Sequence, residues 1–368
     1  MQTQSLLRFL FVAISLALSI DAIAQRPLAT PDRALDAATR NAVIDGLLKK
    51  LNSIYILPDV AKKMELAIRA RQAKQEYDGI TSGQEFARVL TDHLRQVCKD
   101  GHLDVEYYAD GIPYNSEKPP VAEDVQRFRE RGRQRNYEYR KVERLDGGIG
   151  LLQVDGFYPG EWAADTVAAA MSFLANSEAI ILDLRQNSGG TPTGVMLLVS
   201  YFFAEETRLS DQYNRSENTT RQYWTYPIVP GKKLADKDLY ILTSHQTFSA
   251  PESIAYDMQS LKRAIIVGET TGGGAHATTI YRITDHFSAS IPFSRLINPI
   301  TKTDWEGTGV KPDVAVPANQ ALITAHLLAL KKTLKKHHDD SKLADSLQHL
   351  IAAKEKELEA MKAPKATP

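Results

Sequence analysis

The sequence is poor in cysteine and has no excess charge of either sign. Its 368 residues include one cysteine, Cys98, so an intrachain disulfide is excluded. Lysine plus arginine and aspartate plus glutamate both number 45. This balance gives no electrostatic reason to expect nucleic acid or an anionic membrane as a partner. The hydrophobic content of 43% is enough for a sizeable core, and the length allows two or three domains.

Long hydrophobic runs are also missing. The apolar run at residues 9–20 is too short to span a bilayer as a mature helix. It follows Arg8 and precedes a small-residue cleavage pattern at residues 22–24, so residues 1–24 are predicted to be a secretory signal peptide. An uncleaved anchor is the alternative. We expect a bacterial protein of the periplasm or the extracellular space, with no stable membrane insertion after cleavage.

The sequence has no convincing motif for a phosphate, a dinucleotide or a metal. Residues 268–276 are rich in glycine but lack the lysine and spacing of a P-loop, and they do not fit a dinucleotide fingerprint. The adjacent His337 and His338 lie in a polar stretch that we interpret as a solvated helix break. We therefore expect no cofactor and no metal.

Residues 30–105 are predicted to form an N-terminal helical domain. Three stretches carry apolar residues at helical spacing, and Ser82 followed by Glu85 fits a capping box for the third. Cys98 lies on the apolar face of that third stretch, so we interpret it as a core residue. Residues 106–147 are rich in charge and poor in apolar side chains, which indicates a solvated linker.

From residue 148 onward, strand-like and helix-like stretches alternate. Apolar runs that predict buried strands lie at 149–154, 179–184, 239–243 and 264–268. The alternation predicts a layered α/β core over residues 148–316 with a largely parallel sheet. In such sheets, ligands bind at the carboxyl ends of the strands. Residues 317–362 are predicted to form C-terminal helices, and residues 363–368 a disordered tail.

Ser249 lies at a predicted strand-to-helix turn. The N–H groups at a helix N-terminus can stabilise the oxyanion that forms when a serine attacks a carbonyl. Most serines in this position are ordinary N-caps, so a nucleophile needs partners elsewhere. Suitable residue types stand at the ends of other elements: His102, Glu306, Gly189 and Gly190.

Three segments of the core resemble the C-terminal processing peptidases, also called tail-specific proteases. Residues 183–190 resemble their strand-end signature, residues 247–252 their nucleophile turn, and residues 268–273 the loop that follows. The resemblance extends over roughly residues 35–316. It implies an α/β core of the crotonase-like (ClpP/crotonase) fold and a serine peptidase that acts on peptides or unfolded proteins.

One departure from that family bears on the catalytic base. Gly274 stands where the members with a serine–lysine dyad have their lysine. The segments 100–103 and 305–307 instead resemble the branch that contains the interphotoreceptor retinoid-binding protein repeats and the tricorn core protease. That resemblance implies Ser249 as the nucleophile, His102 as the base and Glu306 as its support. The backbone groups expected at the oxyanion or the substrate belong to Gly189, Gly190, Ala250, Gly273 and Gly274.

Several alternatives remain open at this point. His245 and His276 compete with His102 as the base. A protein of this fold could instead bind an apolar ligand such as a retinoid or a fatty acid, with Trp162, Trp224 and Trp305 lining the pocket. A third reading is an assembly role for the C-terminal helices. The oligomeric state is not predicted.

Overall fold

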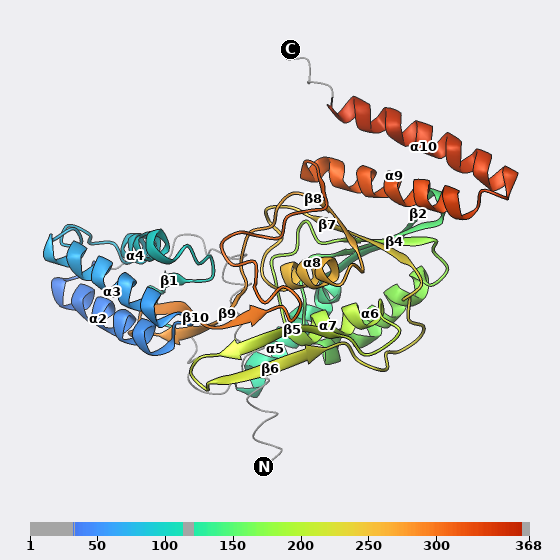
Figure 1. The fold of residues 1–368 in the computed structure, drawn as a ribbon. Helices are drawn as coiled ribbons and strands as arrows, with labels where there is room; N and C mark the ends of the chain where they lie inside the picture. The colour runs from blue at the N-terminus through green and yellow to red at the C-terminus, as the bar shows by residue number, and fades with distance from the viewer. Residues whose placement is uncertain (1–31, 33, 113–120, 363–368) are drawn as a thin grey trace. The chain divides into compact units, whose positions relative to one another are not determined.

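The computed structural model describes residues 32, 34–112 and 121–362. The predicted signal peptide and the predicted disordered tail therefore lie outside the described residues. Contacts within the chain divide it into two compact units, each assembled from separate stretches of sequence (Figure 1). The first unit contains the described residues up to 129 with residues 210–222 and 274–307, and the second contains residues 130–209, 223–273 and 308–362.

Three helices occupy the part of the first unit where the sequence shows three apolar stretches. They are α2 (Ala37–Ile54), α3 (Pro58–Ala73) and α4 (Gly83–Cys98). Asp36 and Ser82 cap α2 and α4 by accepting a first-turn N–H at 2.7 and 2.9 Å, and Pro58 stands in the first turn of α3. The apolar faces of the helices meet in one core that also includes Phe287 and Ile291.

The first unit also contains a five-stranded sheet built around one long strand. That strand, β10 (Phe287–Ile297), pairs antiparallel with β1 (Asp104–Tyr107), β5 (Arg208–Asn214) and β9 (His276–Arg282), and β6 (Thr219–Trp224) lies beyond β5. Helix α4 ends at Lys99, whose left-handed backbone (φ 55°) turns the chain, and β1 starts five residues later. The loop between them is therefore short and held at both ends.

The second unit is built on a six-stranded sheet in the order β11-β8-β7-β4-β3-β2. The strands β3 (Ile149–Val154), β4 (Ala179–Asp183), β7 (Asp238–Thr243), β8 (Ile265–Gly268) and β11 (Val314–Ala315) run parallel, and only the edge strand β2 (Tyr139–Leu145) is antiparallel among the described strands of this sheet. The largely parallel sheet predicted from the alternation is confirmed. Strand β2 lies within the segment that the charge-rich composition led us to interpret as a linker.

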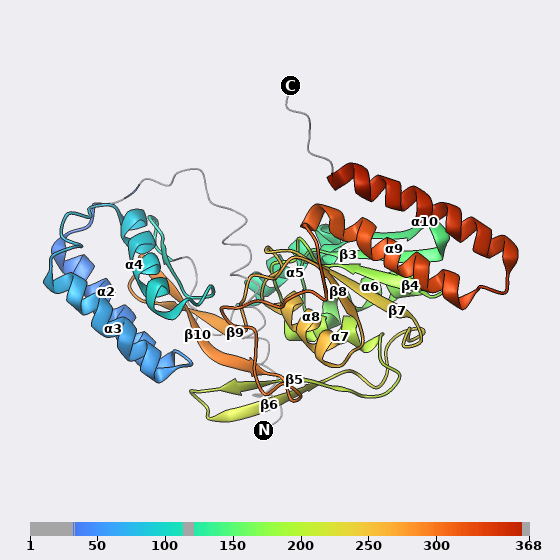
Figure 2. The same cartoon turned by 45° about the horizontal axis from the view of Figure 1, so that its top comes forward.

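Helices cover both faces of this sheet, which explains why its strands are continuously apolar. On one face lie α9 (Ala318–Lys336) and α10 (Ser341–Lys362) (Figure 2). Leu330 and Leu347 of these helices share a buried core with Ile181 of β4. The other face carries α6 (Gly160–Leu174), α7 (Pro192–Ser200) and α8 (Ala250–Ser260), and α5 (Ala122–Gln134) precedes the sheet in the chain. No helix among the described residues is both long and apolar enough to cross a membrane.

Candidate active site

Two turns of the second unit meet at one edge of its sheet. Strands β4 and β7 are parallel neighbours, so the turns that follow them lie at the same edge. The backbone N–H of Phe248 donates to the carbonyl oxygen of Asn187 at 3.1 Å and joins the two turns. The turn at residues 187–190, which we call the glycine turn, is therefore in direct contact with the Ser249 turn at residues 247–250.

Ser249 has a backbone conformation that an ordinary N-cap does not use. An N-cap residue normally has extended φ and ψ angles. Ser249 has φ 69° and ψ −118°, a combination that is costly for a residue with a side chain and that is typical of functional sites. It directly precedes α8, and the side chain is half-buried. The surrounding structure therefore holds a serine in a strained position between a buried strand and a helix N-terminus.

The glycine turn leaves room for Ser249 and supplies a backbone donor. A Cβ atom placed on Gly189 would lie 3.4 Å from the Cβ and 3.7 Å from the Oγ of Ser249. The N–H of Gly189 donates to Asn187 Oδ1 at 3.0 Å, so it is already used inside the turn. The N–H groups of Gly190 and Ala250 make no hydrogen bond to another residue in the described part of the chain. These two N–H groups are therefore not used inside the turns.

Glu252 fastens the serine turn to the glycine-rich loop. It lies in the first turn of α8, and its side chain is fully buried. One oxygen, Oε2, accepts the backbone N–H of Ser249 at 2.7 Å. The other, Oε1, accepts the N–H of Gly273 at 2.7 Å and the hydroxyl of Thr271 at 2.5 Å. The N–H of Gly273 therefore holds the loop in place and is not available to a substrate.

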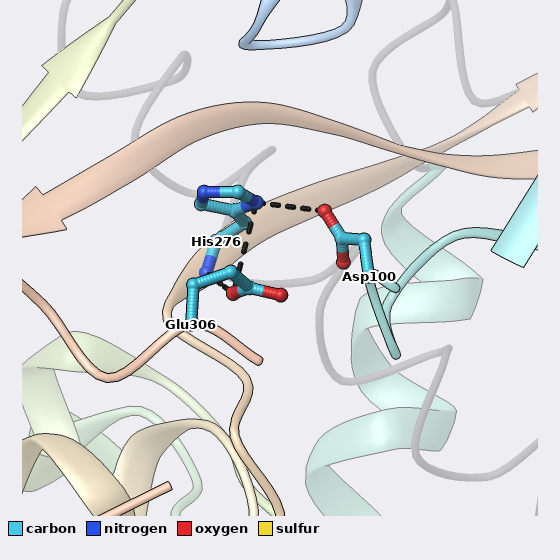
Figure 3. A group of neighbouring side chains, drawn as sticks. All are labelled: Asp100, His276 and Glu306. Carbon is cyan, nitrogen blue, oxygen red and sulfur yellow. Dashed lines mark hydrogen bonds and ion pairs between the residues drawn. The ribbon is translucent and has the colours of Figure 1, made fainter. Parts of the chain in front are cut away.

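In the first unit, a second cluster of polar side chains forms around a buried histidine (Figure 3). His276 stands at the start of β9, and its Nδ1 donates to Asp100 Oδ2 at 2.7 Å and lies 3.6 Å from Glu306 Oε2. The other ring nitrogen points away from both carboxylates (Figure 3). Glu306 Oε2 also accepts the backbone N–H groups of Ala275 at 2.6 Å and of His276 at 3.0 Å. The cluster is thus made by three segments distant in sequence.

Asp100 is the centre of this cluster and is fully buried. Its Oδ2 accepts the hydroxyl of Tyr55 at 3.0 Å as well as His276, and its Oδ1 accepts the backbone N–H of His102 at 3.0 Å. A buried carboxylate is stable only when it is paired and hydrogen-bonded in this way. Asp100 consequently fixes the short loop that carries His102 against β9.

The protonation states follow from burial and from these contacts. Burial alone would raise the pKa of Asp100 and lower that of His276. Their mutual hydrogen bond and charges outweigh burial, so the pKa of Asp100 is lowered and that of His276 is raised. Burial and the charge of Asp100 raise the pKa of Glu306 to about 7, and burial lowers the pKa of His102 to about 4. Near neutral pH, the cluster holds a charged Asp100–His276 pair, a partly ionised Glu306 and a neutral His102.

Among the described residues, these three side chains could also be considered as ligands of a metal ion. Ligand atoms of Asp100, His276 and Glu306 all lie within 4.8 Å of one another. In this arrangement, however, Nδ1 of the histidine is a donor, and Glu306 Oε2 already accepts two backbone N–H groups. A metal would have to displace these bonds, and we therefore interpret the group as a hydrogen-bonded ion cluster.

The predicted site residues fall into two sets. The second unit contains Ser249, Gly189, Gly190, Ala250 and Gly273, which it brings together as described. The first unit contains His102, Gly274 and Glu306. Of the competing histidines, His245 is exposed and lies 3.1 Å from Glu269, whereas His276 is buried and paired with Asp100.

Three residues of these sites were not predicted from the sequence. Glu252 and Asp100 carry no signal of their own, because each is recognised only by what it binds across the fold. His276 was considered only as a competing base. The one available signal was their position inside the segments 247–252, 100–103 and 268–276, which the sequence analysis had singled out. Trp305, considered as a pocket residue, is buried and donates its indole N–H to the carbonyl of Gly274 at 3.0 Å.

Two sequence-family models match this chain. The sequence model of peptidase family S41 matches residues 148–316, and that of the N-terminal domain of peptidase S41 in eukaryotic IRBP matches residues 35–133. Together, the two matches include the Ser249 turn, the glycine turn, Glu306 and the loop with His102.

Individual relatives are distant. The chain is 27% identical over 179 residues to carboxyl-terminal-processing peptidase 2 of Arabidopsis thaliana, covering 46% of this chain and 32% of the relative. It is 30% identical over 141 residues to the tail-specific protease of Haemophilus influenzae, covering 36% and 18%. The chain thus spans about a third or less of these relatives. The crystal structure of a Parabacteroides merdae protein covers 79% of this chain and 96% of its own, with a TM-score of 0.57 and 17% identity, and shows a shared fold.

Proposed function

Because this chain belongs to peptidase family S41, we propose that it is a serine peptidase in which Ser249 attacks the peptide bond. The observation that carries this is the strained Ser249 turn, with Gly189 packed against it and Glu252 holding its N–H. Substrates are peptides or unfolded proteins, and the chemistry needs no cofactor.

The oxyanion hole is assigned to the backbone N–H groups of Gly190 and Ala250. Ala250 follows Ser249 in the chain, Gly190 follows the Gly189 that packs against Ser249, and neither N–H is used by another described residue. The N–H of Ala250 is at the N-terminus of α8, where the helix dipole also favours a negative charge. Two such donors stabilise the charge that develops on the carbonyl oxygen more than the neutral carbonyl of the substrate.

His102 is assigned as the general base and Glu306 as the group that supports it. A base must be neutral before it accepts a proton, and burial keeps the pKa of His102 at about 4. His276, in contrast, is charged near neutral pH because Asp100 raises its pKa. Glu306 Oε1 is buried and has no hydrogen-bond partner among the described residues, so it can accept an imidazole N–H.

The reaction then proceeds in two halves. The Oγ of Ser249 bonds to the carbonyl carbon as His102 takes the hydroxyl proton, and the resulting oxyanion binds the N–H groups of Gly190 and Ala250. The tetrahedral intermediate collapses as the C–N bond breaks and His102 returns the proton to the leaving amine. Water then attacks the acyl ester as His102 takes a proton from it. The C–Oγ bond breaks, His102 returns that proton to Ser249 Oγ, and the carboxylate product leaves.

A hydrolysis assay with a peptide library tests these roles. We expect Ser249→Ala and His102→Ala to lose most of the activity, with general-base removal costing about a hundredfold or more. Glu306→Gln should lower kcat by less than either, because it acts through His102. Full activity in folded His102→Ala would contradict the histidine-base assignment, and full activity in Ser249→Ala would contradict the serine peptidase.

We also propose that the core has the crotonase-like fold and that the protein is exported. The parallel strands with helices on both faces support the crotonase-like assignment of the core. The apolar run at residues 9–20 with its cleavage pattern supports export. N-terminal sequencing of the secreted protein should begin at Gln25, and an intact N-terminus on an exported protein would contradict cleavage there.

A further inference from the structure

The His276 cluster contains two groups that the proposed reaction does not use. Asp100 and His276 lie 176 positions apart, both are buried, and their side chains join at 2.7 Å. An ion pair placed in the interior costs solvation energy and is weak evidence for a stability role. The pair lies next to Glu306, which does have a role in the proposed reaction.

The contacts of Glu306 show what the pair does. One side of its carboxylate is fixed by the backbone N–H groups of Ala275 and His276, and the His276 ring nitrogen lies 3.6 Å from the same oxygen. The other oxygen, Oε1, is left free of hydrogen bonds to described residues. One oxygen of Glu306 is thus bound by backbone groups and lies near the charge of the His276 ring, and the second is left to act.

We propose that His276 is a positioning residue, charged by Asp100, that holds the Glu306 carboxylate in place and ionised so that it can support His102. This rests on the proposed function. His276 touches neither the substrate nor Ser249 in this role. Its partner Asp100 supplies the negative charge that keeps the imidazole protonated in a buried place.

The charges around Glu306 act in opposite directions. Burial and the negative charge of Asp100 raise the pKa of Glu306, and the charge of His276 lowers it. The further ionisable groups that surround the cluster are Tyr55 at the end of α2, Cys98 at the end of α4, His102, and Asp304 in the loop before Glu306. Burial raises the pKa of Tyr55 and Cys98, so both are neutral near pH 7. The charges of Asp100 and His276 therefore determine the pKa of Glu306.

Shifts of the pH–rate profile test this role. Wild-type kcat/KM should fall on the acid side near pH 7, where Glu306 becomes protonated. His276→Gln removes the positive charge, so its acid limb should move up by about one pH unit or more. Asp100→Asn removes the negative charge and, with it, the charge on His276 that Asp100 maintains. These two losses act on Glu306 in opposite directions, so its acid limb should move less than that of His276→Gln. A substitution that only loosens the fold would lower the rate and leave the acid limb at the wild-type pH.

A buried histidine elsewhere provides the matched control. His326 in α9 is buried, and its Nε2 donates to the carbonyl of Asp146 at 2.8 Å. His326→Gln should lower the thermal stability and leave the acid limb where it is in the wild type. If Asp100→Asn does not fold, His276→Gln and His326→Gln decide the question by themselves.

Two outcomes would refute the positioning role of His276, and a third would refute the proposed function. An acid limb of folded His276→Gln that superimposes on the wild-type limb would refute the positioning role. Loss of activity at every pH in folded His276→Gln would also refute it, because a positioning residue leaves the high-pH rate largely intact. Hydrolysis that survives in Ser249→Ala would instead refute the proposed function, whatever the His276 result.

Discussion

The carboxylate of Glu252 accepts the backbone N–H of Ser249 at 2.7 Å and, with its other oxygen, the backbone N–H of Gly273 at 2.7 Å. A single buried side chain therefore fixes the nucleophile turn and the glycine-rich loop to each other. The strained angles of Ser249 persist because the surrounding contacts determine them.

Replacing Glu252 by glutamine should damage both stability and activity. Glutamine keeps the shape but replaces one acceptor oxygen with an NH2 group, which must then face an N–H or hydroxyl donor. We expect a loss of about 1–3 kcal/mol in the free energy of unfolding. We also expect kcat to fall by about a hundredfold, because a small misplacement of a reacting atom has that effect. Urea unfolding and peptide hydrolysis measure the two losses.

Glu85 supplies a control for the Glu252 substitution. It occupies the same third position after its capping serine, Ser82, but its side chain is exposed. Glu85→Gln should change the free energy of unfolding by less than about 0.5 kcal/mol and leave kcat unchanged. Equal effects of the two substitutions would show that Glu252 is an ordinary first-turn glutamate.

An alanine at Gly190 should displace the oxyanion donor. Gly190 has φ 141°, and a Cβ there would overlap the backbone carbonyl of Phe157, so the turn must move. Loss of one oxyanion donor costs about 10²–10³ in kcat, with a smaller effect on KM. As the matched control, Gly79→Ala should keep full activity, because a Cβ at Gly79 meets nothing within 4 Å. Normal kcat in folded Gly190→Ala would contradict the oxyanion assignment.

The raised pKa of Glu306 also predicts a pH dependence of stability. Its folded-state pKa of about 7 lies above the ordinary value of 4.5, so the folded state favours the protonated form. The stability that comes from this preference is fully present below about pH 4.5 and is lost as the pH rises through 7. Relative to Glu306→Gln, the wild type should lose about 3 kcal/mol over that window, from 1.36 kcal/mol per pKa unit.

Urea unfolding of both proteins at pH 5 and pH 8 measures this difference. The glutamine variant removes the titration but keeps a neutral side chain of similar shape. A difference in unfolding free energy between the two proteins that is the same at both pH values would show that the Glu306 pKa is not raised.

Much of the fold was predictable because burial leaves a regular pattern in sequence. The buried strands β3, β4 and β7 are continuous apolar runs, and α9 and α10 carry apolar residues at helical spacing with a polar break between them. The strands β5 and β6 were not predicted. Their residues are mostly exposed or half-buried, so neither strand shows a clear alternation.

The site was predictable in part for a similar reason. Ser249 and the turn at residues 187–190 follow apolar strands, and strand ends in a parallel sheet meet at one edge. The role of Glu252 depends on hydrogen bonds to a loop about twenty positions away. The pairing of Asp100 with His276 joins residues 176 positions apart. No local pattern in the sequence encodes either contact.

Labelling with a fluorophosphonate probe, followed by mass spectrometry of the modified peptide, tests the central claim most directly. A serine that is activated by a base and faces an oxyanion hole reacts with such a probe, whereas ordinary hydroxyls do not. We predict one modified residue, Ser249, with no labelling of Ser249→Ala and slow labelling of His102→Ala. Absence of labelling at Ser249 in folded protein that hydrolyses peptides would contradict the assignment of Ser249 as the nucleophile.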